Sequence, residues 1–156
     1  MICDKLKKYL DDNGVLYQVR RHGEAYTAQE IAESMHVKGH MLVKVVMIKS
    51  EQGYMMAALP ADRRIDIALL RDGLGLKMAA LASEAEFRKL FPDCEPGAMP
   101  PFGNLYGIPV YVDRSLTEDP EILFQAGNHY EAVRIKYADF ARLVQPKVME
   151  ASRKAA

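Results

Sequence analysis

Apolar residues recur along this chain with two different spacings, so helical and strand-like segments alternate. A spacing of three to four residues predicts helices over residues 4–13, 27–35, 83–91 and 139–144. Alternating or β-branched apolar runs predict strands over residues 15–19, 41–48, 54–59, 108–112, 121–125 and 132–137. Because these segments are joined mainly by short turns, the pattern predicts an α+β fold around a curved sheet.

Cap and turn residues define the ends of several segments. Thr27 with Glu30, and Ser83 with Glu86, fit capping boxes that open helices. Gly53 lies between two apolar runs and predicts an antiparallel hairpin. Residues 65–70 fit either a strand or a helix, and residues 77–81 fit a short strand. The polar end of the chain, residues 147–156, is expected to fray.

The composition is that of an ordinary globular protein. The chain has 156 residues, of which 49% are hydrophobic and 27% are charged. This length supports one core, and we expect a single domain over residues 1–156. The formal net charge is zero, so no overall positive field attracts DNA or a membrane surface.

Two further features favour the cytoplasm. The first residues lack the apolar run of a signal peptide, and no segment has the roughly 20 apolar residues that cross a bilayer. Cys3 and Cys94 lie far apart in the sequence and form no Cys-x-x-Cys pair. Two such cysteines predict no disulfide framework, which favours a reducing compartment.

Lys44 lies in the otherwise apolar run Met41–Ile48, which is typical of a largely buried strand. A lysine is seldom buried without a partner or a function. Two interpretations stay open at this point. In one, the strand is half-exposed and Lys44 points to water; in the other, Lys44 serves a site at the surface of the strand.

The segment Gly97–Gly103 is a second candidate, because it is rich in proline and glycine. Prolines stiffen a loop, and glycines let the backbone approach a ligand closely. A rigid loop with exposed N–H groups can stabilise a developing oxyanion without a side-chain nucleophile. Composition alone favours the plainer interpretation, a rigid connector.

Gly127, Asn128 and His129 separate two predicted strands. Gly-Asn is a favoured pair in hairpin turns, and His129 adds a titratable imidazole beside exposed backbone. A single histidine in a turn is most often simply solvated, so the structural interpretation leads here.

The sequence shows no pattern of metal ligands and no common catalytic motif. His36 and His40 are four residues apart, but Gly39 interrupts the helix that would align them, and no nearby cysteine or third histidine completes a shell. Phosphate-loop, dinucleotide-binding and nucleophile-elbow motifs are also absent. We therefore expect neither a metal nor a cofactor.

Taken in order, these segments resemble the YbaK/prolyl-tRNA-synthetase-associated editing-domain family over about residues 26–144. The segments that carry the resemblance are Thr27–Glu30, Leu42–Val45, the Gly-x-x-x-Pro element Gly97–Pro101 with its extension to Gly103, Ile108–Asp113, Phe124–His129 and Ile135–Phe140. The resemblance implies a curved, mixed, largely antiparallel and barrel-like β-sheet surrounded by helices. It also implies hydrolysis of the ester that joins a wrongly attached amino acid to the 3′ end of a tRNA.

The resemblance also implies roles for individual residues. Lys44 matches the functional lysine of the family, and Gly97 and Pro101 match its Gly-x-x-x-Pro loop. The expected site residues are Lys44, Gly97, Pro101 and Gly127 as catalytic residues, and Tyr26, Thr27, Phe102, Gly103, Asn128 and His129 as substrate-binding residues. His129 either takes part in catalysis or adjusts the choice of substrate.

In the mechanism that we expect, an already activated ester needs an oriented water and donors for its oxyanion. Backbone N–H groups near Gly97–Pro101 or Gly127 would be those donors, and Lys44 would hold the terminal phosphate or ribose. The implied protein is a free-standing deacylase that acts in trans on mischarged tRNA bearing a small amino acid, with prolyl-tRNA synthetase as a further candidate partner. The alternative is a noncatalytic module of the same fold that binds tRNA ends or a synthetase.

Overall fold

A computed structural model of the protein describes residues 3–21 and 41–154. Its helices are α1 (Asp4–Asp12), α3 (Ile67–Leu74), α4 (Glu84–Leu90) and α5 (Tyr137–Val144), with 3-10 turns η1 (Gly103–Tyr106) and η2 (Arg114–Glu118). Its strands are β1 (Gln18–Arg21), β2 (Val43–Ser50), β3 (Gly53–Pro60), β4 (Arg63–Ile65), β5 (Ala79–Leu81), β6 (Val110–Asp113), β7 (Glu121–Gln125), β8 (Glu131–Lys136), β9 (Lys147–Met149) and β10 (Ser152–Lys154). No helix within these ranges is long and apolar enough to cross a membrane.

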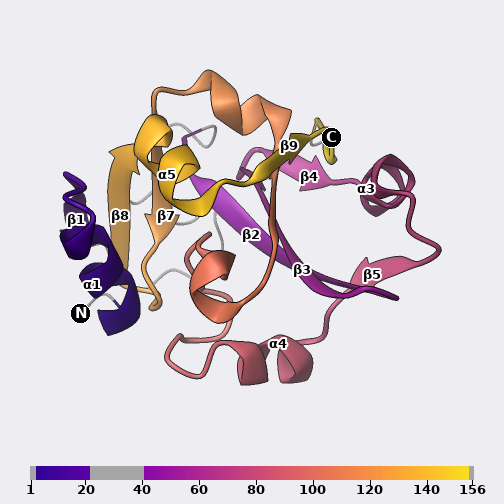
Figure 1. Ribbon diagram of the computed structural model, residues 1–156, viewed down its shortest axis with the longest axis horizontal. Coiled ribbons are helices and arrows are strands. Elements are labelled where there is room, and N and C mark those ends of the chain that lie inside the picture. The colour runs from indigo at the N-terminus through magenta and orange to yellow at the C-terminus, as the bar shows by residue number, and fades with distance from the viewer. Residues whose placement is uncertain (1–2, 22–40, 155–156) are drawn as a thin grey trace.

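The strands form a five-stranded sheet in the order β5-β2-β3-β6-β9, a three-stranded sheet β1-β8-β7 and a two-stranded sheet β10-β4. The β2–β3 hairpin is antiparallel, whereas β6 pairs in parallel with both β3 and β9. Helices α1 and α5 lie beside the three-stranded sheet, and α3 and α4 lie beside the five-stranded sheet (Figure 1). The α+β class and the mixed, largely antiparallel pairing are confirmed. The barrel-like closure is not, because the strands within the described ranges divide among open sheets.

One short contact joins the two larger sheets. Leu42 forms a parallel bridge with Leu123 of β7, and the Leu123 N–H donates to the Met41 carbonyl at 3.0 Å. Because the bridge is parallel, both chains leave it in the same direction. β2 runs on to Lys44, and β7 runs on to the turn that follows Gln125.

The two faces of β2 serve different environments, because side chains alternate along a strand. Val43 and Met47 pack into the main core, which also contains the fully buried Phe102. The Phe102 ring lies between 5.4 and 6.3 Å from the rings of Tyr9, Phe124 and Phe140, so this aromatic group holds α1, α5 and β7 together. Lys44 is paired with Leu59 of β3 and lies on the opposite face.

Most predicted segments are present, with shifted ends. The strand predicted over 15–19 begins at Gln18, because the Val15 N–H still donates to the Leu10 carbonyl at the end of α1. The ambiguous residues 65–70 hold both kinds of structure. Strand β4 ends at Ile65, and the Asp66 side chain then accepts from the Leu69 N–H as the N-cap of α3.

Other local predictions are also settled by the structure. The capping box of Ser83 and Glu86 is confirmed at the start of α4, and the hairpin at Gly53 is confirmed between β2 and β3. The predicted helix over 27–35 lies outside the described residues.

The prediction that residues 147–156 fray is wrong for the part that the structure describes. Strand β9 pairs with β6, and β10 pairs with β4. The buried carboxylate of Asp113 accepts from the Ala151 N–H at 2.8 Å, and Arg63 donates to the Ser152 hydroxyl at 2.6 Å. These partners come from distant strands, which a local polar pattern does not reveal.

Asp113→Asn should lower the free energy of unfolding by about 1–3 kcal/mol, because an amide cannot replace every hydrogen bond of this carboxylate. Burial alone would raise the pKa of Asp113, but hydrogen bonds from Ser115 and the Ala151 N–H outweigh it and lower the pKa. The folded pKa therefore lies below the unfolded one. The stabilisation is present at neutral pH and is lost as the pH falls through the lowered pKa.

Thermal unfolding between neutral and strongly acidic pH measures this effect. The difference between wild type and Asp113→Asn should shrink on acidification. Glu150→Gln is the matched control, because Glu150 is exposed and stands next to Ala151. A constant difference across the whole pH range would show that the Asp113 charge does not hold the end of the chain.

Candidate functional site

The loop after α4 is fastened to the β7–β8 hairpin by two backbone hydrogen bonds. The Gly127 N–H donates to the Ala98 carbonyl at 2.9 Å, and the Glu95 N–H donates to the Gly127 carbonyl at 2.8 Å. Two segments that the sequence analysis selected separately are therefore one unit. The two hydrogen bonds restrict how far the loop can move relative to the hairpin.

His129 strengthens the same junction. The side chain is buried, and its Nε2 lies 3.0 Å from the Pro96 carbonyl oxygen. Since a carbonyl oxygen only accepts, Nε2 carries the proton in this contact. The Glu95 carboxylate lies 3.9 Å from the same nitrogen and would pair with a protonated ring. His129 thus positions the segment that leads into Gly97.

Asn128 builds the turn itself. Its Oδ1 accepts from the backbone N–H groups of Tyr130 and Glu131 at 2.8 and 2.9 Å, and its Nδ2 donates to the Glu131 carboxylate at 3.2 Å. The hairpin-turn interpretation of this segment is confirmed. Substrate binding by Asn128 stays a prediction.

The expected oxyanion donors need a partial correction. The Gly127 N–H is already bonded to Ala98, and Pro101 has no N–H, so neither backbone amide donates in this conformation. The N–H groups of Gly97 and Met99 have no hydrogen-bond acceptor among the described residues. Gly97 is exposed and has a φ of +85°, a conformation that glycine adopts without strain.

Lys44 is half-buried, and its Nζ donates to the Arg63 carbonyl at 2.6 Å. Burial lowers the pKa of Lys44, and the positive charge of Arg64 lowers it further, while Asp62 partly offsets both. The half-exposed position agrees with the first interpretation, except that the ammonium has a carbonyl partner; a role of Lys44 in a site stays a prediction. Within the described ranges, this partner belongs to β4 and not to the Gly97 loop.

Gln125 is a residue that the sequence analysis did not select. It lies two residues after Leu123 on β7, as Lys44 lies two residues after Leu42 on β2, so both follow the same parallel bridge. Its side chain is half-buried, and its Oε1 is buried without a hydrogen-bond partner. The signal in the sequence is a single amide in an apolar strand. Such an oxygen can accept a hydrogen bond from a hydroxyl or an ammonium group.

Three of the expected site residues lie in the interior. Pro101, Phe102 and Gly103 are buried, and Phe102 belongs to the aromatic core. A Cβ on Gly103 would lie 2.7 Å from the Ile108 carbonyl oxygen, so close packing explains this glycine. Substrate contact by these buried side chains is therefore not supported. Tyr26 and Thr27 lie outside the described residues.

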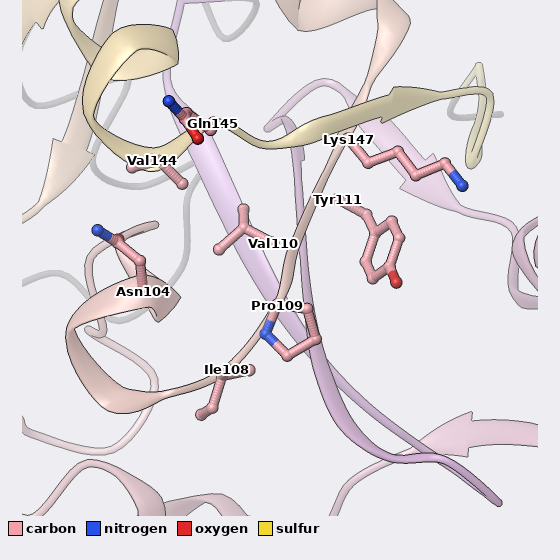
Figure 2. Close-up of a pocket in the computed structure, with 8 residues that line it drawn as sticks. All are labelled: Asn104, Ile108, Pro109, Val110, Tyr111, Val144, Gln145 and Lys147. Carbon is pink, nitrogen blue, oxygen red and sulfur yellow. The ribbon is translucent and has the colours of Figure 1, made fainter.

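A shallow pocket of about 220 Å³ opens elsewhere, between η1, β6 and the end of α5 (Figure 2). Asn104, Tyr111, Gln145 and Lys147 are among its lining residues. None of the site residues expected from the sequence lines it, so it does not extend the junction of loop and hairpin.

The comparisons with known proteins agree with this architecture. Residues 22–143 match the family model described as "Aminoacyl-tRNA editing domain". The chain belongs to this aminoacyl-tRNA editing family. The match contains both Lys44 and the junction of the Gly97 loop with the hairpin, and confirms the resemblance found in the sequence.

Relatives of this editing-family chain span nearly its whole length. A "Multifunctional Ser/Thr-tRNA deacylase ProXp-y" from Escherichia coli (strain K12) is 31% identical, over 97% of this chain and 93% of that protein. A "Prolyl-tRNA editing protein ProX" from Acetoanaerobium sticklandii is 23% identical, over 87% and 86%. The fold matches the crystal structure of a candidate trans-editing enzyme for prolyl tRNA synthetase with a TM-score of 0.85, at 21% identity and over 97% and 96% of the two chains.

Proposed function

We propose that this chain is a deacylase that acts in trans and hydrolyses the ester between a small amino acid and the 3′ end of a mischarged tRNA. Membership of the editing family supports this proposal. So does the relative named as a Ser/Thr-tRNA deacylase, which aligns over 93% of its own length. The observation that carries the proposal is the anchored Pro96–Met99 segment, whose Gly97 and Met99 N–H groups have no described acceptor.

The chemistry needs few protein groups. An aminoacyl ester is already activated, so a bound water adds to the carbonyl carbon once it is oriented. The negative charge then develops on the carbonyl oxygen, where fixed N–H donors stabilise it. The ribose oxygen leaves with a proton when the tetrahedral intermediate collapses. Anchoring by His129 and Gly127 would keep the Gly97 and Met99 donors in place during these steps.

Lys44 and Gln125 suit recognition of the tRNA end. The Lys44 ammonium would hold the terminal phosphate or ribose, and its present acceptor, the Arg63 carbonyl, is neutral and exchangeable. The unpartnered Gln125 oxygen would accept from a hydroxyl or the α-ammonium of the attached amino acid. Both residues follow the Leu42–Leu123 bridge, which places their strands side by side.

We also infer a cytoplasmic location, since tRNA charging takes place there. Prolyl-tRNA synthetase is a candidate partner, because one relative is named as a prolyl-tRNA editing protein. A tRNA-binding module without turnover is the competing function, and the substrate panel below distinguishes it.

The purified protein should hydrolyse at least one tRNA charged with Ser, Thr, Ala or Cys. The hydroxyl amino acids are the first to test, because the Gln125 oxygen offers them an acceptor. The measurement is the decay of each labelled aminoacyl-tRNA, with and without added prolyl-tRNA synthetase. Decay of the whole panel at the buffer rate, together with retained tRNA binding, would establish the noncatalytic module instead.

A Gln125→Leu variant belongs in the same panel. It should lose most of any preference for Ser or Thr over Ala, since a hydrogen bond to a buried neutral acceptor is worth about 0.5–1.5 kcal/mol. An unchanged preference would remove Gln125 from the amino-acid pocket and leave the deacylase proposal intact.

Gly97→Ala should lower turnover by roughly 10²–10³-fold, the loss typical of a displaced oxyanion donor. A Cβ at a φ of +85° is strained, so the loop must change its backbone to accept alanine. Single-turnover deacylation and the thermal midpoint are measured together. Gly75→Ala is the matched control, with a φ of +66° at the end of α3 and open space around it. Equal losses of turnover in both variants would reduce Gly97 to a structural role.

Lys44→Ala should lower turnover by about 10²-fold or more while the thermal midpoint changes little. Lys44→Arg should restore little, because a planar guanidinium is larger and directs its donors differently. Lys49→Ala is the matched control, since Lys49 is half-buried on the same strand and pairs with Glu86. A normal rate for Lys44→Ala on the preferred substrate would exclude Lys44 from the site.

The pH dependence adds a second readout for Lys44. Because its pKa is lowered by burial, the ammonium loses its proton at a lower pH than an ordinary lysine. The part of the rate that depends on Lys44 should therefore fall as the pH rises through the lowered pKa. Lys44→Arg, which stays charged, should lack this alkaline decline after correction for spontaneous hydrolysis.

A further inference from the structure

Four polar side chains from three parts of the chain converge beside the candidate site. The Cys3 thiol donates to Asp93 Oδ2 at 2.8 Å, and the Tyr106 hydroxyl donates to Asp93 Oδ1 at 2.9 Å. The Cys94 sulfur lies 3.5 Å from the Tyr106 oxygen and 3.8 Å from Asp93 Oδ1. Cys3 precedes α1, residues 93 and 94 follow α4, and Tyr106 ends η1. The proposed deacylase mechanism uses none of them.

The spacing of these atoms fits a small coordinated cation. One ligand atom each from Cys3, Asp93 and Cys94 lies within 4.8 Å of the others. A tetrahedral Zn²⁺ site with bonds of about 2.0–2.3 Å has ligand atoms about 3.3–3.8 Å apart. The Tyr106 oxygen, 3.6 Å from the Cys3 sulfur, completes a fourth corner. Only small side-chain movements separate the present geometry from coordination.

The charges around the cluster also suit a divalent ion. Two thiolates and one carboxylate carry three negative charges, which a divalent cation reduces to one. The Lys5 ammonium lies 4.7 Å from the centre of the Tyr106 ring and offsets the remainder. The two thiol protons pass to the buffer as the two metal–sulfur bonds form.

We propose that Cys3, Asp93 and Cys94 bind a thiophilic divalent cation, Zn²⁺, with the Tyr106 hydroxyl or a water in the fourth position. The ion has a structural role, because the three protein ligands come from the start of the chain and from the loop. It braces the candidate site, since the Cys3 N–H donates to the Ala126 carbonyl at 2.8 Å next to Gly127. This inference does not depend on the proposed deacylase function.

Cobalt titration of the reduced, metal-free protein tests the site directly. About one Co²⁺ per chain should bind and give a thiolate-to-metal charge-transfer band, which Zn²⁺ should then displace. Zn²⁺ should also raise the thermal midpoint of the wild type. A non-thiol, weakly chelating reductant keeps both cysteines reduced without competing for the metal.

Variants separate this site from incidental binding. Cys94→Ser should weaken Co²⁺ binding at least on the order of 100-fold, and Cys3→Ser should behave in the same way if it folds. Asp4→Asn is the matched control, since Asp4 is an exposed carboxylate beside Cys3, and it should bind like the wild type. Absence of the band in the wild type, or Co²⁺ binding by Cys94→Ser as tight as that of the wild type, would overturn the proposal. Co²⁺ binding to the wild type without a thiolate band would also overturn it, because other groups would then hold the metal.

Discussion

The pair of backbone hydrogen bonds between the Gly127 turn and the loop after α4 is the constraint on which the candidate site depends. Gly127 donates to Ala98 and accepts from Glu95, so both backbone polar groups of this glycine are used. A Cβ at this position would lie 2.9 Å from the Cys3 Cβ, which explains the absence of a side chain. Through this residue the N-terminus, the loop and the β7–β8 hairpin meet at one point.

The same hydrogen bonds limit which backbone groups of the Gly-x-x-x-Pro motif can act as donors. Gly97 through Pro101 is not a uniform row of donors, because prolines have no N–H and the Ala98 N–H donates to Glu95. The motif instead anchors a few residues and leaves the Gly97 and Met99 amides without a described acceptor. Its buried end, Pro101 to Gly103, fixes the loop in the aromatic core. The buried residues hold the loop rigid, which keeps the amide of the exposed Gly97 in a fixed position.

The two faces of β2 place Lys44 apart from the main core. Alternation along β2 sends Val43 and Met47 into the main core and turns Lys44 to the opposite face, towards the Arg63 carbonyl. The hydrogen bond of Lys44 joins it to the end of β4. The Leu42–Leu123 bridge places β2 beside β7. It also gives Gln125, a residue without an evident motif, the equivalent place on β7.

Local patterns alone determined much of this protein: the hairpin at Gly53, the capping box at Ser83, the strand around Lys44 and the turn at Asn128. Each depends on residues close together in the sequence, where helical period, strand alternation and turn chemistry act directly. The ordered set of motifs also indicated the family. Tertiary structure alone decided which N–H groups of the Gly97 loop are left without an acceptor among the described residues. It also decided that Phe102 packs in the core, that β9 pairs with β6 and that β10 pairs with β4. It also decided that Cys3 meets Asp93 across 90 residues. Such contacts depend on how separate elements pack, and the spacing of residues along the chain carries no record of that packing.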